Sequence, residues 1–184
     1  GGLWPRGPVS ARIVAYWSTL ADGVTNVTLD TTPSQVTRQR QNTDTLRARG
    51  VEMETDWRVG RWVRLNGTAV LSRARFHATP AQPALEGRLV PQSPSRQLAG
   101  GISMHSRRMG TLSVQVRHVG RQYDDDLNEL ALGSFTLLGA SATRRVTARL
   151  HATLAVENLL DEVYDVGRIP VRATGWPLSV RLSL

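Results

Sequence analysis

The stretch at residues 147–167, TARLHATLAVENLLDEVYDVG, changes character halfway along its length. Apolar and polar residues alternate up to Val156, and the alternation ends at Asn158. The apolar positions of the first half are Ala148, Leu150, Ala152, Leu154 and Val156. A period of two predicts a β-strand with one apolar face. The Asn-Leu-Leu-Asp segment that follows predicts a turn or the start of a loop.

The same alternation recurs along the chain. It is clear at residues 11–17, 49–59, 62–73, 111–120 and 176–184, and weaker at residues 97–105 and 132–143. No segment carries the apolar stripe of an amphipathic helix. The pattern therefore predicts an all-β fold of roughly eight strands.

The connections between these strands alternate in length. Short connections are predicted at residues 59–61, 107–110 and 143–145, and long ones at residues 21–45, 76–94, 123–131 and 158–174. If the strands run up and down in sequence, all short turns fall on one rim and all long loops on the other. This is typical of an antiparallel up-and-down transmembrane β-barrel with short periplasmic turns and long extracellular loops.

Charge is distributed unequally between the two faces of the predicted strands. The apolar register carries little charge, as a surface facing lipid requires, because a charged residue at mid-bilayer costs about 2–4 kcal/mol. Arg73 is the exception, near a loop end where a long side chain can reach the interface. The charges predicted to face the barrel lumen are Glu52, Glu54, Asp56, Arg64, Arg117, Arg149, Glu157 and Arg181.

Four tryptophans lie near the ends of predicted strands. They are Trp17, Trp57, Trp62 and Trp176. Tryptophan is enriched where a membrane meets water, so these residues are predicted to form an aromatic belt.

Composition narrows the class of protein. The chain has 184 residues, no cysteine and a formal net charge of +8, which excludes a disulfide framework and a thiolate metal site. It carries no long apolar run and no signal peptide, and we expect it to be a fragment or a processed product. A soluble basic β-domain that binds nucleic acid is an alternative. However, the arginines are scattered and aromatic residues are few, so no nucleic-acid partner is expected.

Several short motifs resemble one family, the TonB-dependent outer-membrane receptors. VENLLDEVYDVG followed by TGWPLSVRLSL resembles the last two strands of their barrel. The residues that match the family pattern are Asn158, Leu159, Asp161, Tyr164 and Gly175, together with Gly50, Val51 and Glu52 of a Gly-Val-Glu strand. Leu160 stands where an aromatic residue is usual, Trp176 where arginine is usual, and Leu184 where the family usually ends in an aromatic residue.

The resemblance implies a role and a setting. Residues 1–184 are expected to be the C-terminal portion of a barrel of about 22 strands, without its plug domain, signal peptide and earlier strands. In the intact parent the implied function is energised uptake of a scarce ligand, such as a ferric siderophore or cobalamin, across the outer membrane of a Gram-negative bacterium. The implied partners are outer-membrane lipid and lipopolysaccharide, the absent strands and plug, and TonB through the absent N-terminal region.

Neither an enzyme activity nor a cofactor is predicted. Glu52, Glu54 and Asp56 share one face, but lumen charges balanced by arginines explain them more simply than acid–base catalysis. YDDDLNE at residues 123–129 offers weak calcium ligands. These are Asp124, Asp126, Asn128 and Glu129, which lack the glycine and spaced glutamate of an EF-hand.

An alternative function is that of a small self-contained eight-stranded outer-membrane barrel with a structural or adhesion role. The edges of the predicted sheet, residues 11–20 and 175–184, would carry unpaired backbone groups that lipid cannot satisfy. The chain is therefore expected to pair with further strands, to close on itself as a small barrel or to aggregate.

Overall fold

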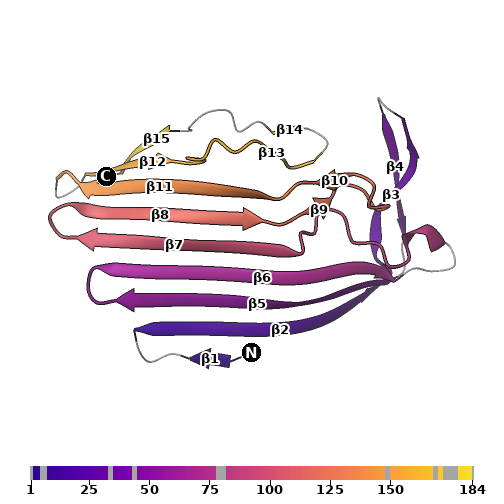
Figure 1. The fold of residues 1–184 in the computed structure, drawn as a ribbon, viewed down its shortest axis with the longest axis horizontal. Helices are drawn as coiled ribbons and strands as arrows, with labels where there is room; N and C mark the ends of the chain where they lie inside the picture. Colours follow the sequence, from indigo (N-terminus) through magenta and orange to yellow (C-terminus); the bar gives the residue numbers. More distant parts are fainter. Residues whose placement is uncertain are drawn as a thin grey trace.

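The computed structural model of the chain describes residues 2–4, 8–32, 35–42, 45–77, 82–147, 150–167, 170–171 and 178–183. Its main sheet has nine antiparallel strands, ordered β1-β2-β5-β6-β7-β8-β11-β12-β15 (Figure 1). They are β1 Gly2–Trp4, β2 Val9–Ala21, β5 Thr45–Val59, β6 Val63–His77, β7 Arg96–Ser106, β8 Gly110–Val119, β11 Phe135–Arg145, β12 His151–Val156 and β15 Leu178–Ser183. Strands that are neighbours in this sheet follow one another along the chain, so the topology is up-and-down.

The predicted all-β antiparallel fold is confirmed, and a strand lies in each of the eight predicted segments. The predicted first edge strand, at residues 11–20, is wrong. β1 pairs with β2 through Gly2↔Ile13, Leu3↔Arg12 and Trp4↔Ala11, so β1 forms that edge. A strand of three residues is too short to show a period of two, which is why the sequence pattern missed it.

Two of the three predicted short turns are confirmed, at residues 60–62 and 107–109. The third, at residues 143–145, is wrong because β11 continues to Arg145 and the connection to β12 spans residues 146–150. Thr143 pairs with Thr153 on one side and Thr111 on the other, so the ladder runs through the predicted turn. Gly110, directly after the second turn, has a φ of +96°, and a Cβ there would overlap the Thr143 carbonyl oxygen, so this position requires glycine.

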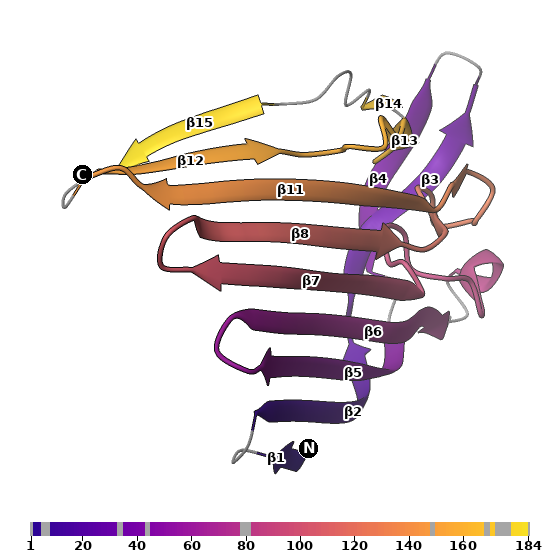
Figure 2. The same cartoon turned by 60° about the vertical axis from the view of Figure 1, so that its left-hand side comes forward.

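The long connections contain structure of their own. The link between β2 and β5 forms a hairpin of β3 Val24–Thr31 and β4 Val36–Asn42. The others contain the 3₁₀ turn η1 Pro83–Leu85, the pair β9 Gln122–Tyr123 and β10 Ala131–Leu132, and the pair β13 Tyr164–Asp165 and β14 Pro170–Val171. All four lie at one end of the main sheet, called the loop end here, and the short connections lie at the opposite turn end (Figure 2).

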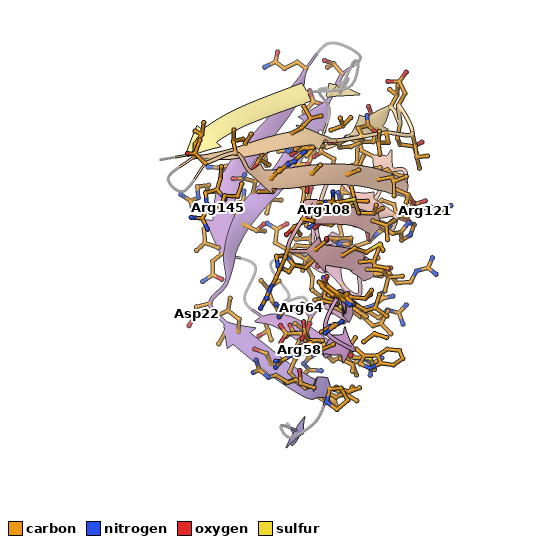
Figure 3. The ribbon with its side chains drawn as sticks, turned by 90° about the vertical axis from the view of Figure 1, so that its left-hand side faces the viewer. Asp22, Arg58, Arg64, Arg108, Arg121 and Arg145 are labelled. Carbon is orange, nitrogen blue, oxygen red and sulfur yellow. The ribbon has the colours of Figure 1, made fainter. Side chains whose placement is uncertain are left out.

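The main sheet is curved into an open arc. Viewed from the turn end, Arg58 and Arg64 lie on the hollow side of this arc (Figure 3). They are directly opposite each other on β5 and β6, so the even-numbered residues of both strands share this inner face. Directly opposite residues on neighbouring strands lie on the same face, so the pairing register shows which residues of β2, β7, β8 and β11 face inward.

The outer face of the arc is apolar and exposed. Its exposed large side chains include Val9, Ile13, Trp17, Val51, Met53, Trp57, Leu71, Leu98, Ile102, Met104, Leu112, Val116 and Leu154. The buried hydrophobic cluster lies instead at the loop end, where Val27, Phe76 and Leu85 pack together. Among the described residues, no helix is long and apolar enough to cross a membrane.

Candidate functional site

The inner face of β2, β5 and β6 carries ion pairs between neighbouring strands. Arg12 faces Glu54 with an N–O distance of 4.0 Å, and Arg64 Nε donates to Asp56 Oδ2 at 2.5 Å. All four side chains come from even-numbered positions, so alternation brings them to one face. The hollow beside them, about 400 Å³, is also lined by Ser10, Asn66 and Thr68.

The remaining predicted lumen charges are spread over the sheet. Glu52 shares the face of Glu54, and the register places Arg117 of β8 on the inner face as well. Glu157 directly follows β12. Arg149 lies outside the described residues, and Arg181 is described only in its backbone pairing with Thr153.

The Asn-Leu-Leu-Asp segment forms a tight turn at the end of β12. Asn158 adopts a φ of +51° and is 5% exposed. Its Nδ2 donates to the Glu162 carbonyl at 3.1 Å, and its Oδ1 accepts from the Glu162 backbone N–H at 2.9 Å. The Asp161 N–H donates to the Asn158 carbonyl at 2.9 Å. Asparagine tolerates the left-handed region and bonds to nearby backbone, which explains this residue type here.

Two further contacts fix this turn to the sheet. The Leu159 N–H donates to the Leu138 carbonyl of β11 at 2.7 Å. Tyr164 stacks on Phe135, with ring centroids 4.1 Å apart and planes inclined by 20°. Three of the matched motif residues therefore stabilise the conformation of this loop, namely Asn158, Leu159 and Tyr164. Phe135 was missed by sequence reasoning because no local pattern links it to Tyr164.

Gly50 of the Gly-Val-Glu strand lies beneath the ring of Tyr16. The two residues are cross-strand partners, and a Cβ at Gly50 would lie 2.6 Å from Tyr16 Oη and 2.5 Å from the Leu71 carbonyl oxygen. A side chain at this position is excluded by the close approach of both groups. Val51 follows on the outer face and Glu52 on the inner face, as alternation requires.

The acidic segment at residues 123–129 joins three loops at the loop end. Asp126, 1% exposed, accepts from the Thr28 N–H at 3.0 Å and from Thr28 Oγ1 at 2.6 Å. Asp124 accepts from Arg38 Nη2 at 3.4 Å and from Gln92 Nε2 at 3.0 Å. The hairpin β3–β4 is thus anchored to the β8–β11 connection by buried carboxylates.

The other members of this segment hold its own turn and the neighbouring loop. Asp125, which sequence reasoning did not single out, accepts from the backbone N–H groups of Glu129 at 3.0 Å and Leu130 at 2.7 Å. Asn128 accepts from the Leu89 N–H at 2.7 Å and donates to its carbonyl at 2.9 Å. The carboxylates of Asp124 and Asp126 face different protein donors, and no metal-binding group of three or more acidic or histidine residues occurs among the described residues.

The tryptophans of the predicted belt lie toward both ends of the sheet. Trp17 is on the outer face of β2 and is 74% exposed, and Trp57 is on the outer face of β5 near the turn end. Trp62 lies in the turn between β5 and β6, with the Arg61 guanidinium 4.7 Å from its ring centroid. Gly175 and Trp176 lie outside the described residues.

Taken together, a curved up-and-down sheet with an exposed apolar outer face and a charged inner face defines one wall of a membrane barrel. The family model described as "TonB dependent receptor-like, beta-barrel" matches residues 3–159. The chain therefore belongs to the TonB-dependent receptor family. This is a family of receptors and transporters, not of enzymes, and its members are outer-membrane proteins of Gram-negative bacteria.

Solved structures of this family share the fold. The ferric yersiniabactin uptake receptor of Yersinia pestis is 20% identical with a TM-score of 0.73, over 97% of this chain and 26% of that receptor. The copper transporter OprC is 13% identical with a TM-score of 0.74, over 98% of this chain and 28% of its own. The ferric preacinetobactin receptor of Acinetobacter baumannii is 20% identical with a TM-score of 0.70, over 98% and 27%.

Each of these structures matches nearly the whole of this chain, so the likeness in fold is not confined to one part of the sheet. The chain spans about a quarter of the length of the solved structures that it matches. No curated protein sequence is significantly similar to it.

Proposed function

We propose that this chain forms part of a TonB-dependent receptor that takes up a scarce ligand across the outer membrane of a Gram-negative bacterium. One observation carries the proposal: the sheet combines an exposed apolar outer face with ion-paired charges on its inner face. Lipid covers an apolar surface without cost but cannot solvate charged side chains. A water-filled lumen can solvate them. The names of the similar structures, ferric siderophore receptors and a copper transporter, favour a chelated metal as the ligand.

In this proposal residues 1–184 are the C-terminal portion of a larger barrel, in which further strands pair with β1 and β15. Those edge strands carry backbone groups that need partners within a bilayer. The plug and the segment that contacts TonB would belong to other parts of the same receptor. The loop end faces the exterior, and the turn end faces the periplasm.

No covalent chemistry is part of the proposal, because transport here means binding, release and passage. The ligand would first meet the loop cluster, where a hollow of about 150 Å³ is lined by Asn26, Arg38, Gln92 and Asp124. It would then pass the charged inner face below. Lipid and lipopolysaccharide would cover the outer face.

The test is uptake by cells that carry the complete gene, compared with a strain from which the gene is deleted. Ferric complexes of a catecholate and a hydroxamate siderophore, a copper chelate and cobalamin, each radiolabelled, are supplied under iron limitation. We expect one of these probes to accumulate only with the gene present, and only in a background with functional TonB. Uptake that persists without TonB would refute energised transport, and no gene-dependent uptake of any probe would refute the proposed ligand class.

A further inference from the structure

Four arginines gather on the outer face of the sheet near its loop end. Arg47 and Arg49 of β5 and Arg73 and Arg75 of β6 occupy odd-numbered positions, in the same register as Val51 and Leu71. Arg49 is directly opposite Arg73, and Arg47 is directly opposite Arg75. We call these four residues the arginine patch. Only Arg73 was noticed in the sequence, because the faces of the predicted strand over residues 49–59 were assigned from Val51 onward.

The four arginines of the patch carry more positive charge than the one carboxylate that lines the same hollow, that of Glu86, can balance. Arg75 donates to the Gly87 carbonyl. Within the described part of the chain, Arg47, Arg49 and Arg73 form no ion pair and are exposed. Like charges directly opposite on neighbouring strands destabilise a sheet, so two such pairs side by side favour binding of an anion.

The surface around the patch is shaped as a shallow pocket. It has a volume of about 290 Å³ and is lined by the four arginines together with Trp17, His77, Glu86 and Gly87. The nearby carboxylate of Glu86 is 3.3 Å from Nδ1 of His77. Side chains of all four arginines and of Trp17 therefore line one hollow, and a guanidinium group can donate two parallel hydrogen bonds to phosphate oxygens.

The depth of the patch follows from strand geometry. Below it, the outer register of β5 from Val51 to Val59 is free of charge, and so is that of β6 from Val63 to Leu71. Eight residues span about 27 Å along a strand, or about 21 Å along the membrane normal at the tilt usual for such barrels. The apolar band of an outer-membrane barrel is about 25 Å tall. Arg49 and Arg73 therefore lie where the hydrocarbon ends and the headgroups begin.

We propose that the arginine patch binds the phosphate groups of lipid A, the phosphorylated glycolipid of the outer leaflet, while its acyl chains cover the apolar register below. The inference rests on the proposed function, because that function sets the loop end outside. Charge complementarity, the headgroup depth and the outward-facing pocket favour a lipid over a ligand of the lumen. The inner face, which carries its own ion pairs, takes no part.

The test uses the complete receptor, extracted from outer membranes in mild detergent and stripped of lipid. Binding is measured for bisphosphorylated lipid A, for its dephosphorylated form, for phosphatidylglycerol and for inorganic phosphate. The variant Arg49→Gln/Arg73→Gln removes two charges from the patch. Its matched control, Arg108→Gln/Arg144→Gln, removes two charges at the turn end, Arg108 from a turn and Arg144 from the outer register.

We expect the patch variant to bind bisphosphorylated lipid A at least about tenfold more weakly than the wild type, and the control to bind it unchanged. Dephosphorylation should weaken binding to the wild type by a similar factor, and inorganic phosphate should not compete. Equal loss in both variants, equal binding of phosphatidylglycerol, or full competition by inorganic phosphate would overturn the proposal.

Heat-modifiable mobility and probe uptake are recorded for the same proteins. A patch variant that inserts and transports normally, yet has lost lipid A binding, supports the inference. Normal insertion and transport with unchanged lipid A binding refutes it and leaves the proposed function standing. A wild-type receptor that never enters the outer membrane refutes the proposed function and this inference with it.

Discussion

Substitution of Asn158 tests whether the Asn-Leu-Leu-Asp turn holds structure or binds ligand. In Asn158→Ala, the two side-chain hydrogen bonds to Glu162, at 2.9 and 3.1 Å, are lost. Each contributes about 0.5–1.5 kcal/mol. The φ of +51° adds about 1 kcal/mol of strain for alanine. The free energy of local opening should therefore fall by about 2–4 kcal/mol.

Hydrogen exchange of the complete receptor measures this quantity directly. A peptide covering residues 157–165 should lose protection by about 30- to 700-fold in Asn158→Ala, because each 1.4 kcal/mol is a factor of about ten. Glycine adopts a positive φ without strain, so Asn158→Gly loses only the two side-chain hydrogen bonds. Its loss of exchange protection should therefore be smaller than that of Asn158→Ala, by the factor that corresponds to about 1 kcal/mol of strain. A purely ligand-binding role would leave exchange unchanged in both variants and alter only probe uptake. That result would refute the structural account.

Two further substitutions test the packing of the wall and of the loops. Gly50→Ala places a Cβ 2.5 Å from a backbone oxygen and 2.6 Å from Tyr16 Oη, so the folded, heat-modifiable band should be lost. Gly67→Ala is the matched control, because its Cβ would lie 3.2 Å from the Thr55 methyl group and no closer than 3.9 Å to any backbone atom. This variant should keep the folded band, and equal behaviour of the two variants would contradict the reasoning. Thr28→Val removes the hydroxyl bond to buried Asp126, so limited proteolysis should cut the β3–β4 hairpin faster, by roughly 10-fold for about 1–2 kcal/mol. An unchanged cleavage rate would show that this bond does not anchor the hairpin.

Most strands of the main sheet were predictable because they are long enough to show a period of two. β5 and β6, with 15 residues each, show several periods of the apolar–polar alternation. Their pairing with each other follows from their order in the chain. β1 was not predictable from three residues, and the end of β11 was misplaced because the weak alternation over residues 132–143 gave out there. Pairing on both sides of Thr143 overrides that local signal.

The loop end was less accessible to sequence reasoning. Its contacts join residues far apart in the chain, such as Thr28 with Asp126 and Phe135 with Tyr164. The acidic segment has the composition of a cation site, yet the structure supplies protein donors to Asp124 and Asp126. Composition alone does not tell whether a carboxylate faces a cation or a neighbouring loop.

The length over which β5 is paired decides which of its charged residues are assigned to the outer face. If faces are assigned only from Val51 onward, Arg47 and Arg49 belong to neither face, and their charges cannot be related to the membrane. A strand that begins at Thr45 puts Arg47 and Arg49 in the register of Val51, directly opposite Arg75 and Arg73. Because side chains alternate strictly along a strand, the pairing that starts at Thr45 fixes which face each charge occupies. The arginine patch thus follows from the pairing of β5 with β6 over their full length, and its height above the apolar band follows from the same register.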